Sequence, residues 1–263
     1  MKWWRIWTAG STIVAGALLT HMARQAREER IRTHEWTFTN LPPSLDGFTI
    51  FFICDLHRRE VSDELLQHVE CDLVIIGGDL TERGVPKQRV EQNIYKLREL
   101  GPTYFVWGNN DQEVNTDWLR EALSARGVIL LENKVVYHIY KGTEIGLVGF
   151  NCPEGSEQAI DHVLATRRDD VFTGVICHYP EIREYLLGEE ISFILCGHTH
   201  GGQIRPLGLG VAEAGGVVQK GSRYQLISNG FGTTLLPLRL GAPPETHLIT
   251  LKVAEAGGEG YDL

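Results

Sequence analysis

The chain has 263 residues, of which 43% are hydrophobic and 22% charged, and its formal net charge at pH 7 is −9. This composition excludes a disordered chain, which would carry far fewer apolar residues, and a collagen-like repeat, because the 29 glycines and 10 prolines are scattered. The acidic balance disfavours nucleic acid as a partner, since an acidic body repels the phosphate backbone.

The N-terminal 32 residues differ from the rest of the chain in charge and hydropathy. They carry six basic and two acidic side chains, and residues 6–22 contain no Asp, Glu, Lys or Arg. A run of this length behind two tryptophans lies at the lower limit for a membrane span. A cleaved signal peptide and a short buried helix are the alternatives, but the only small-x-small site lies inside the apolar run. We therefore predict an uncleaved single-pass membrane anchor with its basic flank in residues 1–32, and a basic, partly polar tether over about residues 23–46.

Two weaker signals concern localisation. Four arginines follow the apolar run within ten residues of Met22, so the positive-inside rule slightly favours a body on the cytoplasmic side. The five cysteines are odd in number and lack the spacing of a disulfide scaffold, which agrees with a reducing compartment. We expect a protein of the cell membrane whose catalytic domain is cytoplasmic.

Beyond the anchor, short apolar runs alternate with amphipathic stretches. The strands predicted from the runs are Phe48–Cys54, Leu73–Ile76, Tyr104–Trp107, Glu144–Phe150, Gly174–Cys177, Ile191–Cys196, Tyr224–Ser228 and Thr246–Val253. Helices are predicted after Ser62, from Pro86, and around Trp118 and Ile160, where apolar residues recur at helical spacing. This order predicts α/β layering with a strand-rich C-terminal third. We assign residues 33–263 to one domain.

Five of the apolar runs end in polar clusters of one chemical kind. In chain order the clusters are Asp55-Leu56-His57, Gly78-Asp79, Gly108-Asn109-Asn110-Asp111, His178 and Gly197-His198-Thr199-His200. Ligands of open α/β sheets bind beyond the carboxyl ends of the strands. Asp, His and Asn supply the oxygen and imidazole ligands that suit Mn²⁺, Fe or Zn²⁺. Each cluster alone would fit hydrogen-bonded polar groups on a loop, but the ordered set predicts a metal site.

These motifs, together with the stretch from Ser228 to Glu245, resemble the signature of the calcineurin-like metallophosphoesterases, and in particular their membrane-associated bacterial members. The resemblance covers about residues 47–253. It implies a four-layer αββα sandwich that holds two divalent metal ions. Carried over by motif, Asp55, His57 and His200 bind one ion, Asn109, His178 and His198 bind the other, and Asp79 bridges them.

The resemblance also implies an activity. It predicts a phosphoesterase that hydrolyses a phosphomono-, phosphodi- or pyrophosphoester with a bimetal-activated hydroxide. The predicted anchor favours a substrate that is linked to the membrane, such as a lipid-linked phosphoester. The choice among Mn, Fe and Zn and the oligomeric state stay open at this point.

The sequence departs from the family pattern at two positions. Asn110 stands where most members have a histidine that contacts phosphate and protonates the leaving group. We expect Asn110 to contact the phosphate, but an amide has no proton to deliver. Glu82 replaces the second aspartate of the Gly-Asp-x-x-Asp motif, and we expect it to act behind the metal ligands. The first departure raises an alternative function, a non-catalytic, metal-stabilised binding protein.

Overall fold

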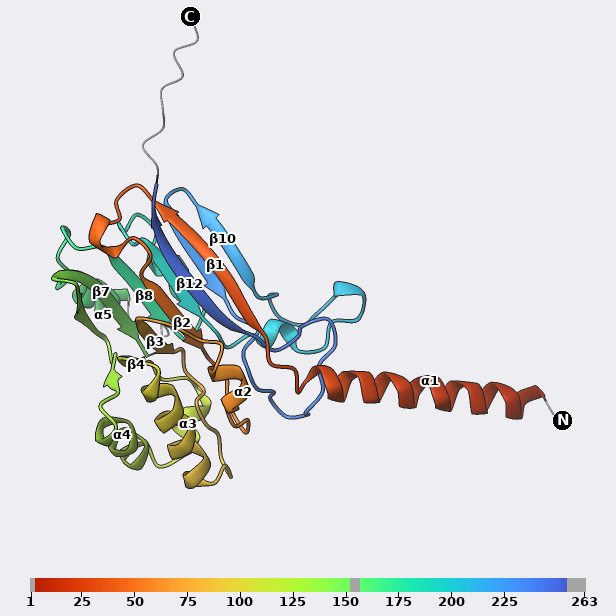
Figure 1. The fold of residues 1–263 in the computed structure, drawn as a ribbon. Helices are drawn as coiled ribbons and strands as arrows, with labels where there is room; N and C mark the ends of the chain where they lie inside the picture. Colours follow the sequence, from red (N-terminus) through yellow and green to blue (C-terminus); the bar gives the residue numbers. More distant parts are fainter. Residues whose placement is uncertain (1–2, 152–156, 255–263) are drawn as a thin grey trace, which may run out of the picture.

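The computed structural model describes the backbone of residues 3–151 and 157–254, and the side chains from residue 14 onward. Within these residues the strands form two six-stranded sheets (Figure 1). The first sheet has the order β1 (Ile31–Phe38), β12 (Thr246–Val253), β2 (Thr49–Ile53), β3 (Leu73–Ile76), β4 (Thr103–Phe105) and β5 (Ile129–Leu130). The second has the order β10 (Gly216–Lys220), β11 (Arg223–Ile227), β9 (Phe193–Cys196), β8 (Thr173–Cys177), β7 (Thr143–Phe150) and β6 (Lys134–Tyr140).

The main core lies between the two sheets. Strand β2 illustrates how it is built: Ile50 and Phe52 face the second sheet, whereas Phe51 and Ile53 face the helices on the outside. All four side chains are fully buried, because strands that are covered on both faces bury successive residues. This double burial explains why the strand reads as a continuous apolar run. The predicted α/β fold is confirmed as a mixed fold with two sheets.

Helices cover the outer faces of both sheets. The first sheet packs against α2 (Asp63–Leu66), α3 (Lys87–Glu99) and α4 (Thr116–Ala125), and the second against α5 (Glu157–Leu164) and α6 (Ile182–Tyr185). Two helices begin at side-chain caps: the Ser62 hydroxyl accepts from the amide of Leu65 at 3.0 Å, and the Asn115 side chain accepts from the amide of Trp118 at 2.8 Å. Such caps satisfy donors that have no partner inside the helix. The helix predicted after Ser62 is therefore present, although it is only four residues long.

The predicted tether is wrong from residue 31 onward. Strand β1 lies within it and pairs in parallel with β12, from Ile31 opposite Thr246 to Phe38 opposite Val253. The ring of Trp36 stacks on Tyr224 of the other sheet, with centroids 5.1 Å apart. The prediction failed because most side chains of this edge strand are exposed or only partly buried, so the sequence shows no long apolar run.

The predicted membrane anchor is not supported. Helix α1 (Trp3–Gln25) projects away from the sheets (Figure 1). Among the residues whose side chains are described, no helix is long and apolar enough to cross a membrane. Gly16, Thr20 and His21 interrupt the apolar character of the described part of α1. Side chains 1–13 of the predicted anchor lie outside the described set, and the predicted membrane localisation has no support from this helix.

The C-terminal end of α1 is attached to the body of the protein. Met22 and Ala26 are buried, and the carbonyl of Met22 accepts from the amide of Arg239 at 3.1 Å. The side chain of Gln25 accepts from the amide of Gly241 at 3.2 Å. Helix α1 therefore leaves the body at a fixed point, next to the loop around Arg239.

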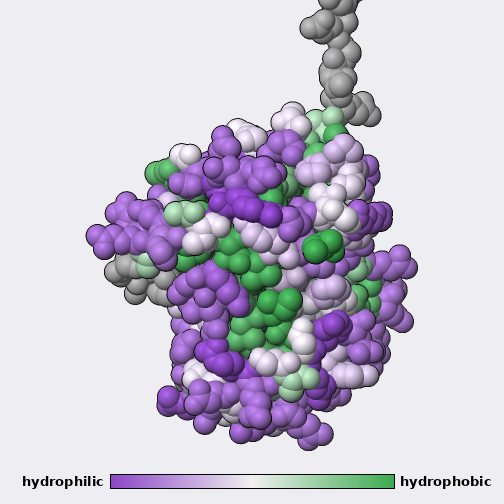
Figure 2. All heavy atoms as spheres, turned by 90° about the vertical axis from the view of Figure 1, so that its left-hand side faces the viewer, coloured by the Kyte–Doolittle hydropathy of each residue, from purple (hydrophilic) through white to green (hydrophobic). Residues whose placement is uncertain are grey.

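The opposite side of the molecule is mainly hydrophilic, with a hydrophobic patch near its centre (Figure 2).

Candidate metal centre

The polar clusters predicted from the sequence meet between the two sheets. Strands β2, β3 and β4 run parallel in the first sheet, and β8 and β9 run parallel in the second, so the ends of each set lie along one edge. Five of the side chains that follow these strands are no more than 5% exposed: Asp55, His57, Asp79, His178 and His200. Burying so many polar groups is costly unless they are paired or bind a cation.

The five side chains form two overlapping groups that are suited to metal ions. One consists of Asp55, His57 and His200 and the other of Asp55, Asp79 and His178, and the ligand atoms of each group lie within 4.8 Å of one another. The Nε2 atoms of His57 and His200 are 3.0 Å apart. Oδ2 of Asp79 lies 3.3 Å from Nε2 of His178 and 3.7 Å from Nε2 of His57. Asp79 therefore faces ligands of both groups.

The two other predicted ligands differ in their placement. His198 is half-buried, its Nδ1 lies 3.3 Å from Nε2 of His178, and its amide donates to Asp55 at 3.2 Å. The structure thus brings His198 to the cluster. The side chain of Asn109 is exposed and makes no hydrogen bond with a described residue. The structure does not bring Asn109 to the cluster.

Asn110 turns toward the cluster and holds Asp79. Its amide N–H donates to Oδ1 of Asp79 at 2.8 Å, and its side-chain Nδ2 donates to Oδ2 at 2.7 Å. The residue expected to contact phosphate therefore contacts a carboxylate that is itself a candidate ligand. This bidentate contact fixes both oxygens of Asp79.

The backbone at the cluster is strained. Ten non-glycine residues of the described chain have positive φ, and half of them are predicted metal ligands: Asp55, His57, Asp79, His198 and His200. A side chain in this region clashes with its own backbone and costs of order 1–3 kcal/mol. Such conformations persist only where the surroundings enforce them. Their concentration at one place marks this cluster as the functional site.

Two glycines leave room for the carboxylates. A Cβ atom on Gly108 would overlap Oδ1 and the backbone nitrogen of Asp79. A Cβ atom on Gly197 would lie 2.6 Å from Oδ2 of Asp55. The glycines next to the ligand motifs thus let the backbone lie close to these carboxylates. One follows a strand of the first sheet and the other a strand of the second.

The pKa values show how the cluster distributes its charge. Burial alone would raise the pKa of Asp79, but His178, His57 and the Asn110 amide outweigh it and hold the pKa below its usual range. For His178, burial alone would lower the pKa, but the neighbouring carboxylates raise it to about 9. For His200, burial dominates and lowers the pKa to about 4, so its imidazole is neutral near pH 7. The cluster presents anionic oxygens beside imidazole nitrogens.

This donor set fits divalent cations of the Mn²⁺, Fe and Zn²⁺ class. Nδ1 of His178 lies 2.9 Å from the carbonyl of Gly77, and because a carbonyl can only accept, the ring proton is at Nδ1 and donates to it. The raised pKa keeps a second proton on Nε2 in the metal-free protein, and a metal ion that displaces this proton would be bound by Nε2, an arrangement typical of histidine ligands. Nε2 of His57 and Nε2 of His200 face each other beside the carboxylate of Asp55, and a second metal ion could bind there by displacing the proton between them.

Three supporting residues stand behind the candidate ligands. Asp111 is fully buried and accepts from the amides of Gly108 at 2.9 Å and Thr81 at 3.0 Å, and burial together with the charge of Asp79 raises its pKa to about 8. Glu82 places Oε2 3.0 Å from Nδ1 of His57, as expected for a residue behind the ligands.

Arg239, the third, was missed as a functional residue by the sequence analysis. Its fully buried guanidinium lies with Nη2 3.2 Å from Nδ1 of His200. The same group donates to the carbonyls of Asn229 at 2.7 Å, Gly232 at 2.7 Å and Ala242 at 2.8 Å. The only signal was the Pro-Leu-Arg stretch, which contributed to the family resemblance without indicating a role.

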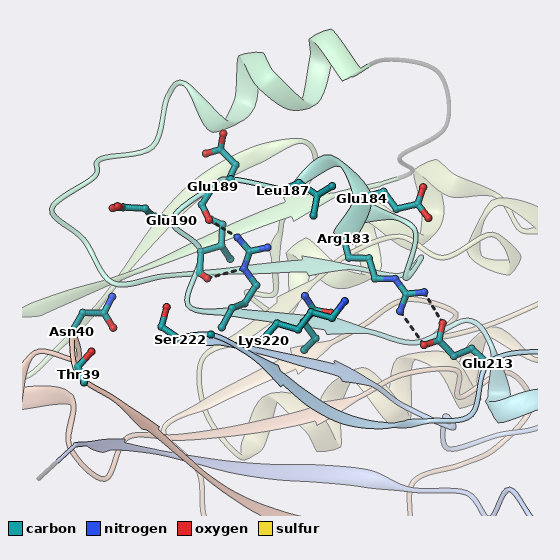
Figure 3. Close-up of a pocket in the computed structure, with 15 residues that line it drawn as sticks. Thr39, Asn40, Arg183, Glu184, Leu187, Glu189, Glu190, Glu213, Lys220 and Ser222 are labelled. Atoms are coloured by element: carbon teal, nitrogen blue, oxygen red, sulfur yellow. Dashed lines mark hydrogen bonds and ion pairs between the residues drawn. The ribbon is translucent and has the colours of Figure 1, made fainter.

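The described residues also form a groove away from this centre. We call it the larger groove, because its volume exceeds that of a second groove beside the centre. It has a volume of about 1030 Å³ and is lined by α6, the segment that follows it, and strands β10 and β11 (Figure 3). Its two arginines already have partners: Arg183 forms a two-pronged ion pair with Glu213, and Arg223 donates to the carbonyls of Leu186 at 2.9 Å and Ile191 at 3.1 Å. This groove contains none of the predicted ligands.

Comparisons with known proteins agree with the geometry. A family model described as calcineurin-like phosphoesterase matches residues 48–202. The chain is 42% identical to the protein YpbG of Bacillus subtilis over 250 residues, which cover 91% of this chain and 94% of YpbG. It is 28% identical to the phosphodiesterase YaeI of Escherichia coli, with 78% and 82% covered. It is 26% identical to a transmembrane protein with metallophosphoesterase domain of Bos taurus, with 87% and 58% covered.

We predict that Gly108→Ala strongly impairs metal binding. The added methyl overlaps Asp79, and overpacking of this kind costs about 1–3 kcal/mol even where a core can adjust. The expected result is a folded protein with reduced metal content after dialysis against Mn²⁺, measured by elemental analysis. Gly216→Ala is the control, because a Cβ there meets nothing within 4 Å. Equal metal content in the two variants would contradict the role given to Gly108.

Proposed function

Because the chain belongs to the calcineurin-like phosphoesterase family, we propose that it is a phosphoester hydrolase that works with two divalent metal ions. The observation that carries the proposal is the pair of overlapping ligand groups at the buried ends of the strands. The phosphodiesterase among its relatives supports the same class of reaction. The identity of the ions within the set Mn, Fe and Zn is not part of the proposal.

In this proposal the ligands fall into two sets around a shared carboxylate. Asp55, His57 and His200 hold one ion, Asn109, His178 and His198 hold the other, and Asp79 bridges them. The position of Asp79 Oδ2 between His57 and His178 supports the bridge. Asn109 has to turn its exposed side chain inward to join its set. When bound, the two ions would supply Lewis-acid chemistry, lowering the pKa of water and neutralising charge on the phosphoryl oxygens.

The protein's own groups orient this site. Asn110 and Gly77 fix Asp79 and His178 through the hydrogen bonds described above, so the ligands keep one geometry during turnover. In the proposal, the Asn110 amide also donates to a phosphoryl oxygen of the substrate. No side chain at that position delivers a proton to the leaving group, because an amide is not an acid at neutral pH.

The rival function is a binding protein that uses the metals only for stability, and one experiment separates the two. For the full chain we expect about two equivalents of metal and hydrolysis of bis(p-nitrophenyl) phosphate in Mn²⁺. Asp79→Ala should lower the occupancy of both metal sites, and His178→Ala mainly that of one, since a bridging carboxylate serves two ions. Asp161→Ala, at an exposed position on α5, is the control. Two bound metals without hydrolysis of any phosphoester would favour the binding protein.

The missing acid generates a prediction about leaving groups. Without a proton donor at Asn110, aryl esters should be hydrolysed much faster than alkyl esters, because only the former leave well unprotonated. Asn110→His should recover part of the factor of about 10²–10⁴ that general acid catalysis contributes. The measurement is kcat/KM on a paired aryl and alkyl phosphodiester. If the variant keeps its metals and gains nothing on the alkyl ester, the proton comes from another source.

The finer part of the proposal is that the substrate is presented at a membrane surface. Five strongly exposed apolar residues lie on two neighbouring loops, and we call them the loop patch: Leu207, Leu209, Val211, Leu235 and Leu236. The loops are joined by hydrogen bonds from the Gln203 side chain to the carbonyls of Thr234 at 3.1 Å and Leu236 at 3.0 Å. Both lie on the side from which α1 projects (Figure 1). A relative named as a transmembrane protein supports the same idea.

The loop patch is tested with vesicles of phosphatidylglycerol and phosphatidylethanolamine. The full chain should sediment with them, and the double variant Leu235→Ser with Leu236→Ser should bind roughly tenfold or more weakly, because burying one leucine contributes about 1.5–3 kcal/mol. Leu187→Ser is the matched control, since this leucine is exposed next to the larger groove outside the patch. Unchanged sedimentation of the double variant would rule out the loop patch as the contact.

A further inference from the structure

A second groove, of about 790 Å³, opens beside the candidate metal centre. Its lining includes Arg27, Arg83, Thr233 and Thr234, together with Asn110 and Glu82. It meets the centre through two of these residues: Asn110 donates to Asp79, and Glu82 lies against His57. A substrate with its phosphoester at the centre therefore has this groove as a place for its other groups.

The groove is positively charged although the chain is acidic overall. Four arginines and two glutamates line it, whereas the whole chain has a net charge of −9. Positive walls in a cleft raise the local concentration of anions.

Two of the arginines are engaged within the protein. Arg58 pairs with Glu82 and donates to the carbonyl of Arg83 at 3.2 Å. Arg59 donates to the carbonyls of Phe231 at 2.6 Å and Glu28 at 3.0 Å. Arg59 thereby joins the loop that precedes β12 to the segment after α1. Both guanidinium groups thus have partners within the protein, although that of Arg58 is also exposed to solvent.

The other two arginines have no such partners. The side chains of Arg27 and Arg83 are exposed and make no hydrogen bond or ion pair with a described residue. The hydroxyls of Thr233 and Thr234, which also line the groove, are likewise without a hydrogen bond to the described part of the chain. The larger groove differs in this respect, because both of its arginines are bound by the protein itself. Free donors thus gather in the groove that adjoins the site.

We propose that this groove binds a second phosphate group of the substrate through Arg27 and Arg83, with the hydroxyls of Thr233 and Thr234 as further donors. The inference rests on the proposed hydrolase function and narrows its substrates to phosphoesters that carry another phosphate. The guanidinium fork matches phosphate oxygens with two parallel hydrogen bonds, which makes arginine the fitting residue for a dianion. Two free arginines suit one phosphate rather than an extended polyanion.

The test uses linear alkane bisphosphonates of increasing chain length as competitive inhibitors of bis(p-nitrophenyl) phosphate hydrolysis by the full chain with Mn²⁺. Each is compared with the monophosphonate of the same length, so the series scans the distance between the metal centre and the arginines. The best bisphosphonate should inhibit about tenfold more strongly than its partner, since charge-assisted contacts of this kind are worth about one order of magnitude in affinity. The advantage should shrink as salt screens the exposed charges.

Variants assign the effect to the groove. In Arg27→Gln and Arg83→Gln the ratio between the two inhibitors should fall toward one, whereas Arg126→Gln, an exposed arginine at the end of α4, should keep it. If no bisphosphonate exceeds its monophosphonate while hydrolysis proceeds, the second-phosphate site is wrong and the hydrolase proposal stands. If metal-loaded protein hydrolyses no phosphoester, the hydrolase proposal itself fails.

Discussion

The site depends on the hydrogen bonds that the buried guanidinium of Arg239 makes. Burial lowers the pKa of this group to about 10, which still leaves it charged at neutral pH. No carboxylate forms an ion pair with it in the described chain, and its charge is met by backbone carbonyls from both sides of the loop between β11 and β12 and by His200. A buried charge without compensation would cost several kcal/mol, so this loop has to close around it. Its amide also fixes the end of α1.

The same loop supports the strained ligands. Gly230 and Gly232 approach Asp55 closely, and the amide of Gly232 donates to the Asp55 carbonyl at 2.6 Å. Positive φ at Asp55 and His57 is tolerated because this packing leaves no room for the relaxed alternatives. Stability is thus lower at the site than in the surrounding sheets, and a bound cation would offset part of the difference by linkage. Apart from Asn109, the fold holds the candidate ligands in place ahead of any metal.

The features that could be predicted from the sequence are those that depend on residues close to one another in the chain. Asp55, Asp79 and His178 were predictable because each follows a doubly buried strand, and parallel strands bring their ends together. The orientations of Asn109 and Asn110 could not be predicted, because the two side chains are chemically identical and adjacent in one turn. Only the contact with Asp79 distinguishes them. Strand β1 was hidden by its exposed polar residues, and Arg239 by the absence of any periodic pattern around it. The anchor prediction rests in part on side chains 1–13, which lie outside the described set, and the described part of α1 gives it no support.

The order of strands in the first sheet has a consequence for how the protein is made. Strand β12 is the last in the chain, yet it lies between β1 and β2, which are among the first. Ile31 meets Thr246 across more than two hundred residues of chain, so this pairing cannot begin until Thr246 has been synthesised. Until then, the growing chain contains β1 and β2 without the strand that lies between them. Contacts so distant in sequence form slowly. During that interval the open edges of both strands are exposed to other chains, which makes late insertion of β12 the step at which folding and aggregation compete.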